Sequence, residues 1–147
     1  MAVNELRFDH LGVVVSRLEK GRRHLADGLG VSQWTEEIVD PVNGVRLQFG
    51  LDPAGVCFEI LEPLDEQSPV YAALKTGKAI LNHVAYRVPD LQAAGARLGA
   101  AGWSRTSEPK PAVAYGGRSI QFFVSPSRLV VEMIEAWDHE HIYAAAS

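Results

Sequence analysis

The apolar and polar positions in the first half of the chain predict a strand, a helix and three further strands. Residues 11–15 form an apolar, β-branched run that is typical of a strand. Ser16 stands where the cap of a following helix is expected, and Gly28 and Gly30 are expected to end that helix. The apolar residues on one helix face are Leu18, Leu25 and Leu29. Extended segments are predicted next, over residues 33–39, 45–49 and 56–61, with turns at 40–44 and 52–55.

The second half of the chain repeats the first at an offset of 73 positions. His10 falls on His83 and Glu59 falls on Glu132, without a gap between them. Other identical pairs are Val15 and Val88, Leu18 and Leu91, Leu25 and Leu98, Gly44 and Gly117, Gln48 and Gln121, Phe49 and Phe122, and Glu62 and Glu135. The repeat predicts a strand over residues 82–88, a helix from 91 to about 101, and strands near 103, 119–124 and 129–134. A linker over residues 63–76 is expected to contain a short helix at 70–75.

Each copy therefore has the order β-α-β-β-β. One helix cannot cover both faces of such a sheet, so the exposed faces must meet each other or a partner. We expect an α+β fold in which tandem repeats form a curved mixed β-sheet, with helices outside and a cleft on the concave side. The single domain spans residues 1–147, with repeat one at about 7–63, repeat two at about 80–136 and a tail at 137–147.

Two histidines and two glutamates recur at the same place in both copies. Glu59 and Glu132 interrupt apolar strands, where an unpartnered carboxylate would cost several kcal/mol. Taken singly, His10 or His83 would be a hydrogen-bonded core residue, and either glutamate an edge residue with its carboxylate in solvent. The shared spacing of 49 positions instead favours one metal site. Its two nitrogens and two oxygens suit a divalent cation such as Zn, Ni, Co, Fe or Mn.

The remaining candidate groups have simpler interpretations. Glu62 and Glu135 lie three positions beyond the candidate ligands, so we expect them on the opposite sheet face and in solvent. Cys57 is expected to be a small buried apolar residue without chemistry. Three further histidines are interpreted as surface residues, namely His24, His139 and His141.

The composition of the chain mainly excludes certain classes of partner and location. With 147 residues, of which 47% are apolar, the chain can bury one core. Its net charge of −4 and scattered basic residues argue against a nucleic-acid partner. No apolar run approaches the roughly 20 residues that span a bilayer, so no membrane association is expected. Glu5 and Arg7 interrupt the start, where a signal peptide would be apolar, and a cytoplasmic protein is expected.

The residues resemble the vicinal oxygen chelate superfamily of glyoxalases, bleomycin resistance proteins and dioxygenases. The likeness rests on the duplicated unit with Asp9-His10, Glu59, Asn82-His83 and Glu132, and it extends to Glu135. The stretches 59–64 and 82–88, with Ser68-Pro69 between them, are most similar to methylmalonyl-CoA epimerases. This resemblance implies one divalent metal ion bound by His10, Glu59, His83 and Glu132.

Two positions depart from the epimerase pattern. Some epimerases carry a proton-transfer carboxylate on the strand after a Gly-Val pair, and here that position is Leu47. No evident cluster holds the phosphates of coenzyme A, apart from basic residues around the first helix, namely Arg17, Lys20, Arg22 and Arg23. The scaffold therefore says more about the cation than about the reaction.

The resemblance implies an isomerase, epimerase or lyase that removes a proton beside a carbonyl and forms a metal-chelated enolate. Our hypothesis is that one or both of Glu59 and Glu132 leave the metal to shuttle protons, which makes Leu47 tolerable. Arg87, on the His83 face, is a candidate for binding a substrate carboxylate, with a structural ion pair as an equal alternative. The expected partner is a small molecule, such as an acyl-CoA or another carbonyl compound.

Other activities in the same superfamily remain open. A lactoylglutathione lyase is the nearest alternative, followed by an extradiol dioxygenase, a thiol transferase and a non-catalytic antibiotic-binding protein. The cleft can form within one chain or across a homodimer, and we favour the homodimer. Three aromatic residues are candidates for lining a pocket or an interface, namely Trp103, Tyr115 and Trp137.

Overall fold

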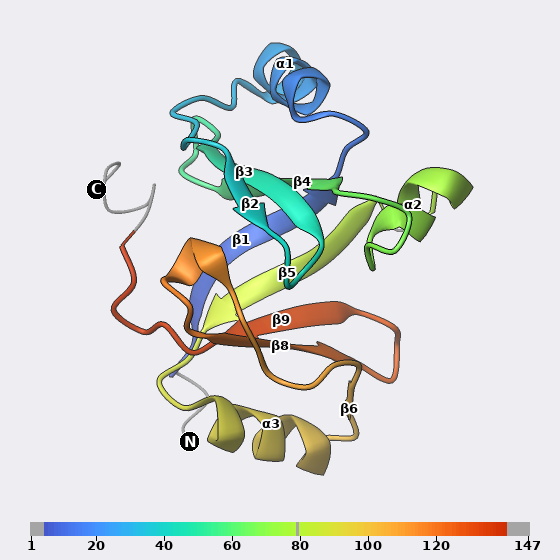
Figure 1. The fold of residues 1–147 in the computed structure, drawn as a ribbon. Coiled ribbons are helices and arrows are strands. Elements are labelled where there is room, and N and C mark those ends of the chain that lie inside the picture. Colours follow the sequence, from blue (N-terminus) through green and yellow to red (C-terminus); the bar gives the residue numbers. More distant parts are fainter. Residues whose placement is uncertain (1–4, 79, 141–147) are drawn as a thin grey trace. The chain divides into compact units, whose positions relative to one another are not determined.

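The computed structural model describes residues 5–78 and 80–140, which form two compact units (Figure 1). The first unit contains His10–Asn82, and the second contains His83–His139 together with the strand residues up to Asp9. In chain order the elements are β1 (Arg7–Val14), α1 (Leu18–Leu29), β2 (Ile38–Asp40), β3 (Val45–Leu51), β4 (Cys57–Pro63), α2 (Tyr71–Thr76), β5 (Leu81–Arg87), α3 (Leu91–Ala100), β6 (Ser104–Arg105), β7 (Lys110–Pro111), the 3-10 helix η1 (Val113–Tyr115), β8 (Ser119–Val124) and β9 (Val130–Ile134).

In the first unit, α1 packs on a sheet with the strand order β2-β3-β4-β1 (Figure 1). β1 runs parallel to β4, and the other neighbours are antiparallel. The helix approaches its sheet closely at Gly21, where an added Cβ would lie 2.7 Å from Val15 Cγ1. α1 ends before Gly30, as the sequence predicted, and Gly30 adopts φ +71°. Gly28, the other glycine expected to end the helix, lies inside it. Among the three leucines predicted to share one helix face, Leu18 is buried, whereas Leu29 is 53% exposed.

In the second unit, α3 packs on a sheet with the order β5-β9-β8-β6, and β7 pairs with β8 (Figure 1). β5 runs parallel to β9, as β1 does to β4. The core between helix and sheet contains Val88, Leu91, Ala94, Leu98, Phe123, Val131 and Met133. The first unit thus has the predicted β-α-β-β-β order, and the second has the same order with one additional short strand, β7. Both sheets are mixed, which confirms the α+β class and the tandem repeat. Within residues 5–78 and 80–140, no helix has the length and apolar character needed to cross a membrane.

Two duplicated glutamates cap the main helices, which corrects the prediction that Ser16 caps the first one. Ser16 does not cap α1, because the residue before the helix is Arg17 and its side chain makes no capping hydrogen bond. Instead, the backbone N–H of Leu18 donates to Glu62 Oε2 over 3.0 Å. In the second unit, the N–H of Leu91 donates to Glu135 Oε2 over 2.7 Å. Glu135 is exposed, as predicted, and Glu62 is half-buried. The sequence did not show that both carboxylates accept from helix N–H groups that have no partner within the helix.

Loss of the Glu62 carboxylate is therefore expected to destabilise the first unit. For Glu62→Ala we expect the free energy of unfolding to fall by about 1 kcal/mol, the usual effect of removing a helix cap. Urea denaturation followed by circular dichroism measures this change. Glu66→Ala, at a nearby exposed glutamate, is the control. Equal stability of the two variants would show that the cap contributes nothing.

Trp137 and His139, in the segment after β9, pack within the second unit. The Arg7 guanidinium lies 3.9 Å from the centre of the Trp137 ring, and Arg7 Nη1 donates to the Trp137 carbonyl over 2.9 Å. His139 is half-buried with its ring centre 4.8 Å from that of Tyr115, so its interpretation as a surface residue is wrong. His24 is exposed as predicted, and His141 lies outside the described residues. Tyr115 is buried at 2% exposure, which removes it from the candidate interface residues.

Candidate metal centre

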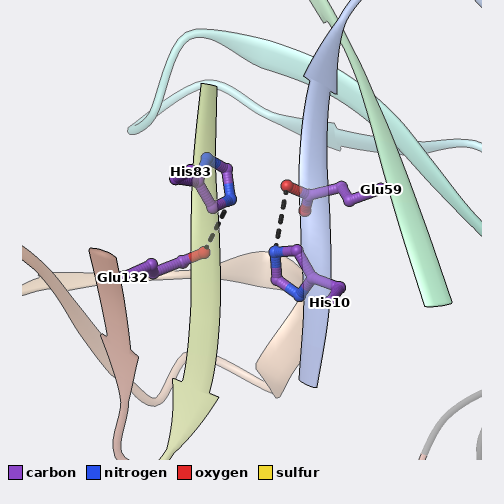
Figure 2. A group of neighbouring side chains, drawn as sticks. All are labelled: His10, Glu59, His83 and Glu132. Atoms are coloured by element: carbon purple, nitrogen blue, oxygen red, sulfur yellow. Dashed lines mark ion pairs between the residues drawn. The ribbon is translucent and has the colours of Figure 1, made fainter. Parts of the chain in front are cut away.

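The first unit brings His10 and Glu59 together. Gly12 on β1 is the register partner of Glu59 on β4, and His10 shares a sheet face with Gly12 because side chains alternate along a strand. His10 Nε2 lies 3.3 Å from Glu59 Oε1 (Figure 2). The histidine is fully buried and the glutamate is 5% exposed. The Phe49 ring packs edge-on against the imidazole, with the ring centres 5.2 Å apart.

The second unit brings His83 and Glu132 together in the same way. Ala85 on β5 is the register partner of Glu132 on β9, and His83 lies two residues before Ala85. His83 Nε2 lies 3.1 Å from Glu132 Oε1, and both residues are 4% exposed (Figure 2). Phe122 packs on His83 as Phe49 does on His10, with ring centres 5.4 Å apart. The duplicated sequence thus forms the same buried pair in each unit.

The atoms of each pair fit neighbouring positions around one cation. Two ligand atoms bound at about 2.1 Å lie about 3.0 Å apart at a right angle and about 3.4 Å apart at the tetrahedral angle. The separations of 3.1 Å and 3.3 Å fall within this range. Imidazole nitrogen with carboxylate oxygen is also a donor set typical of first-row divalent metals. By residue type and burial, these two histidines and two glutamates are candidate metal ligands.

Arg87 lies in a buried polar cluster of the second unit. Its Nε is 3.0 Å from Asp9 Oδ1, and its Nη1 donates to the His139 carbonyl over 2.8 Å. Asp9 is fully buried and its Oδ2 accepts a hydrogen bond of 2.6 Å from the Tyr115 hydroxyl. The structural ion pair that the sequence left open is therefore present. The role of Arg87 in binding a substrate carboxylate stays a prediction.

This cluster could hardly be predicted from the sequence. Asp9 was noted only as part of the Asp9-His10 motif. Because the second copy has Asn82 at the matching position, the repeat did not identify Asp9 as a duplicated carboxylate. Its strand position beside apolar residues was the available signal, because a buried carboxylate needs a partner. The hydrogen-bond partner of Asp9 could not be identified from the sequence, because Tyr115 lies 106 positions away and no sequence pattern links the two residues.

Residues 9–122 match the family model of the Glyoxalase/Bleomycin resistance protein/Dioxygenase superfamily. The chain belongs to this superfamily. The match spans both units and includes His10, Glu59 and His83, while Glu132 lies beyond its end. The family resemblance that the duplicated motifs indicated is thereby confirmed.

Several proteins to which the chain is similar are methylmalonyl-CoA epimerases. The chain is 29% identical over 117 residues to an ethylmalonyl-CoA/methylmalonyl-CoA epimerase of Cereibacter sphaeroides, covering 79% of this chain and 86% of the relative. A methylmalonyl-CoA epimerase structure from Mycobacterium tuberculosis matches with a TM-score of 0.76 and 24% identity, over 99% of this chain and 96% of that one. A Streptomyces coelicolor methylmalonyl-CoA epimerase variant, in complex with 2-nitronate-propionyl-CoA, matches with a TM-score of 0.73 and 22% identity, over 92% and 97% of the chains. These structures share the fold of this superfamily member.

Proposed function

We propose that His10, Glu59, His83 and Glu132 hold one divalent cation and that the protein is an isomerase of the methylmalonyl-CoA epimerase type. The observation that carries the proposal is the duplicated pair: each unit buries one imidazole nitrogen beside one carboxylate oxygen, on the same strands and in the same register. The similarity to an epimerase of Cereibacter sphaeroides supports the reaction type. The cation is Co, Ni, Zn, Mn or Fe, since all five accept these ligands.

When bound, such a cation stabilises the negative charge that develops on a carbonyl oxygen as the neighbouring carbon loses its proton. The two glutamates are the groups that we propose to move the protons. Leu47 supports this assignment, because it is buried at 3% exposure and lies on the same face of the sheet as Glu59, two residues before Phe49, the register partner of Glu59. A leucine cannot act as a base at this position, so the Glu59 and Glu132 carboxylates remain as the candidate bases.

For the substrate we propose an acyl-CoA thioester with a carboxylate near the reacting carbon. Arg87 is the proposed carboxylate ligand. Its contacts with described residues use Nε and Nη1, so a substrate carboxylate would approach Nη2. Among the basic residues suggested for the phosphates of coenzyme A, Arg22 is engaged by Gln48, whereas Arg17, Lys20 and Arg23 are exposed. These three are the better candidates for a phosphate contact.

Incorporation of solvent deuterium tests the reaction. The protein is incubated in D2O with methylmalonyl-CoA or, separately, with the hemithioacetal of methylglyoxal and glutathione. We expect deuterium at the carbon beside the thioester carbonyl of methylmalonyl-CoA. Turnover of the hemithioacetal alone would instead identify a lactoylglutathione lyase, and oxygen consumption with a catechol would identify a dioxygenase. No exchange with either substrate in the metal-loaded protein would contradict the proposal.

Metal removal should abolish exchange reversibly. Dialysis against a chelator is expected to eliminate the activity, and one equivalent of Co, Ni, Zn, Mn or Fe per chain should restore it. The same titration should raise the midpoint of thermal unfolding, because a ligand present at 100 times its dissociation constant stabilises the folded state by about 2.7 kcal/mol. Elemental analysis gives the stoichiometry. Two cations per chain would mean that each His-Glu pair binds separately.

A further inference from the structure

The second unit has a cavity of about 680 Å³ between α3 and β8, on the sheet face opposite the candidate metal ligands. Ser119, Gln121 and Phe123 of β8 line it, whereas Phe122, the register partner of Glu132, points to the other face because side chains alternate. The helix contributes Leu91, Gln92, Gly95, Ala96 and Gly99, and the rim includes Trp103, Arg105, Pro109 and Glu135. This cavity is therefore separate from the proposed reaction site.

The first unit has a matching glutamine, and the two amides are held in the same way. Gln48 Nε2 donates to the Thr35 carbonyl over 2.7 Å, and Gln121 Nε2 donates to the Ser107 carbonyl over 3.0 Å. The hydroxyls of Thr35 and Ser107 each accept a hydrogen bond of 3.1 Å from the backbone N–H that follows the glutamine. Both glutamines therefore have the same partner for the amide nitrogen, and both lie on the helix side of their sheets.

The two units differ in what meets the carbonyl oxygen of the amide. Arg22 of α1 donates from Nη1 to Gln48 Oε1, and its guanidinium also lies 3.7 Å from Glu37. The position that matches Arg22 in the second copy is Gly95. Gln121 as a whole is 6% exposed, and its Oε1 accepts no hydrogen bond from any described residue but is accessible to solvent. The cavity therefore occupies the place that an arginine side chain fills in the first unit.

The other residues that line the cavity favour a ligand with a cationic group and an apolar alkyl chain. The Glu135 carboxylate lines the cavity and uses Oε2 for the cap of α3. Arg105, at the rim, is paired over 3.8 Å with Glu108. Leu91, Trp103 and Phe123 supply apolar surface. An amide oxygen and a carboxylate accept N–H groups, and a guanidinium supplies several N–H donors in one plane.

We propose that this cavity binds a small alkylguanidinium cation, with Gln121 Oε1 accepting its N–H and Glu135 balancing its charge. In the first unit a guanidinium already contacts the matching amide oxygen, because Arg22 Nη1 donates to Gln48 Oε1, although its counter-charge there is Glu37. The binding site is additional to the proposed isomerase site and does not depend on it.

Calorimetric titration of the metal-loaded protein with n-butylguanidinium tests the proposal. We expect saturable binding of one equivalent per chain, and at least about tenfold weaker binding by Gln121→Leu, because a hydrogen bond to a charged group is lost. n-Butanol is the uncharged control ligand. Binding of n-butanol with equal affinity, or no saturation by n-butylguanidinium in the millimolar range, would overturn the proposal.

Gly95→Arg places the arginine of the first unit into the cavity and gives a second, independent test. An added Cβ at Gly95 would meet only Phe123, at 3.4 Å, which is an ordinary contact, so the fold should persist. We expect this variant to lose n-butylguanidinium binding and to keep deuterium exchange. Gly28→Arg adds the same charge at an open position on α1 and should bind as the unsubstituted protein does. Equal binding by Gly95→Arg and Gly28→Arg would place the ligand elsewhere and refute the assignment.

Discussion

Glutamine in place of Glu132 is expected to lower deuterium incorporation into methylmalonyl-CoA by about 10²- to 10⁴-fold, the usual contribution of a positioned proton-transfer group. The amide has nearly the shape of the carboxylate, so the buried contact with His83 keeps its size. It neither carries the negative charge that a cation requires nor takes up a proton at neutral pH. Mass spectrometry of the recovered thioester, with the metal content measured in parallel, separates these two losses.

The control for this variant is Glu62→Gln. Glu62 lies on β4, three residues beyond the other candidate base, and its side chain caps α1. A glutamine oxygen can still accept the Leu18 N–H, so stability and exchange should both remain close to those of the unsubstituted protein. If Glu132→Gln exchanged deuterium at the full rate while retaining its metal, Glu132 would have no part in proton transfer.

Duplication made much of the fold and both His-Glu pairs predictable. A strand of alternating residues is ambiguous when read alone, but a second copy at a fixed offset repeats the same strands, turns and buried charges. The equal separation of His10 from Glu59 and of His83 from Glu132 placed each pair on neighbouring strands, and the structure brings each pair within 3.3 Å. The assignment of all four to one cation stays a prediction.

Features that depend on tertiary packing could not be predicted in the same way. Ser16 has the right residue type for a cap, but a carboxylate 44 positions after Leu18 takes that role. The way α1 packs on β4 decides which backbone N–H the Glu62 side chain reaches. The periodicity of the sequence does not determine this packing. The cavity beside Gln121 arises because the second copy has Gly95 where the first has Arg22. The sequence shows this difference, but its effect on the cavity follows only once the helix is known to lie over the glutamine.

The largest loss of stability is expected for Asp9→Asn. Asp9 is fully buried and is the counter-ion of Arg87, whose side chain is only 14% exposed. The substitution leaves the guanidinium without a counter-charge, and breaking a buried ion pair from one side costs about 3–5 kcal/mol. We expect the free energy of unfolding to fall by about 3 kcal/mol. Urea denaturation in the presence of a chelator measures it without a contribution from bound metal.

A double-mutant cycle distinguishes the ion pair from a general loss of packing. Removing the charge of Arg87 as well, in Asp9→Asn/Arg87→Gln, should recover part of the stability, because no unpaired charge then remains. Tyr115→Phe removes the 2.6 Å hydrogen bond to Asp9 but keeps the charge pair, and should cost less than Asp9→Asn. Asp27→Asn, at an exposed aspartate of α1, should change stability by less than about 0.5 kcal/mol. Strictly additive losses for Asp9 and Arg87 would mean that the Arg87 charge is stabilised by the carbonyl groups of Trp137 and His139 instead of by Asp9.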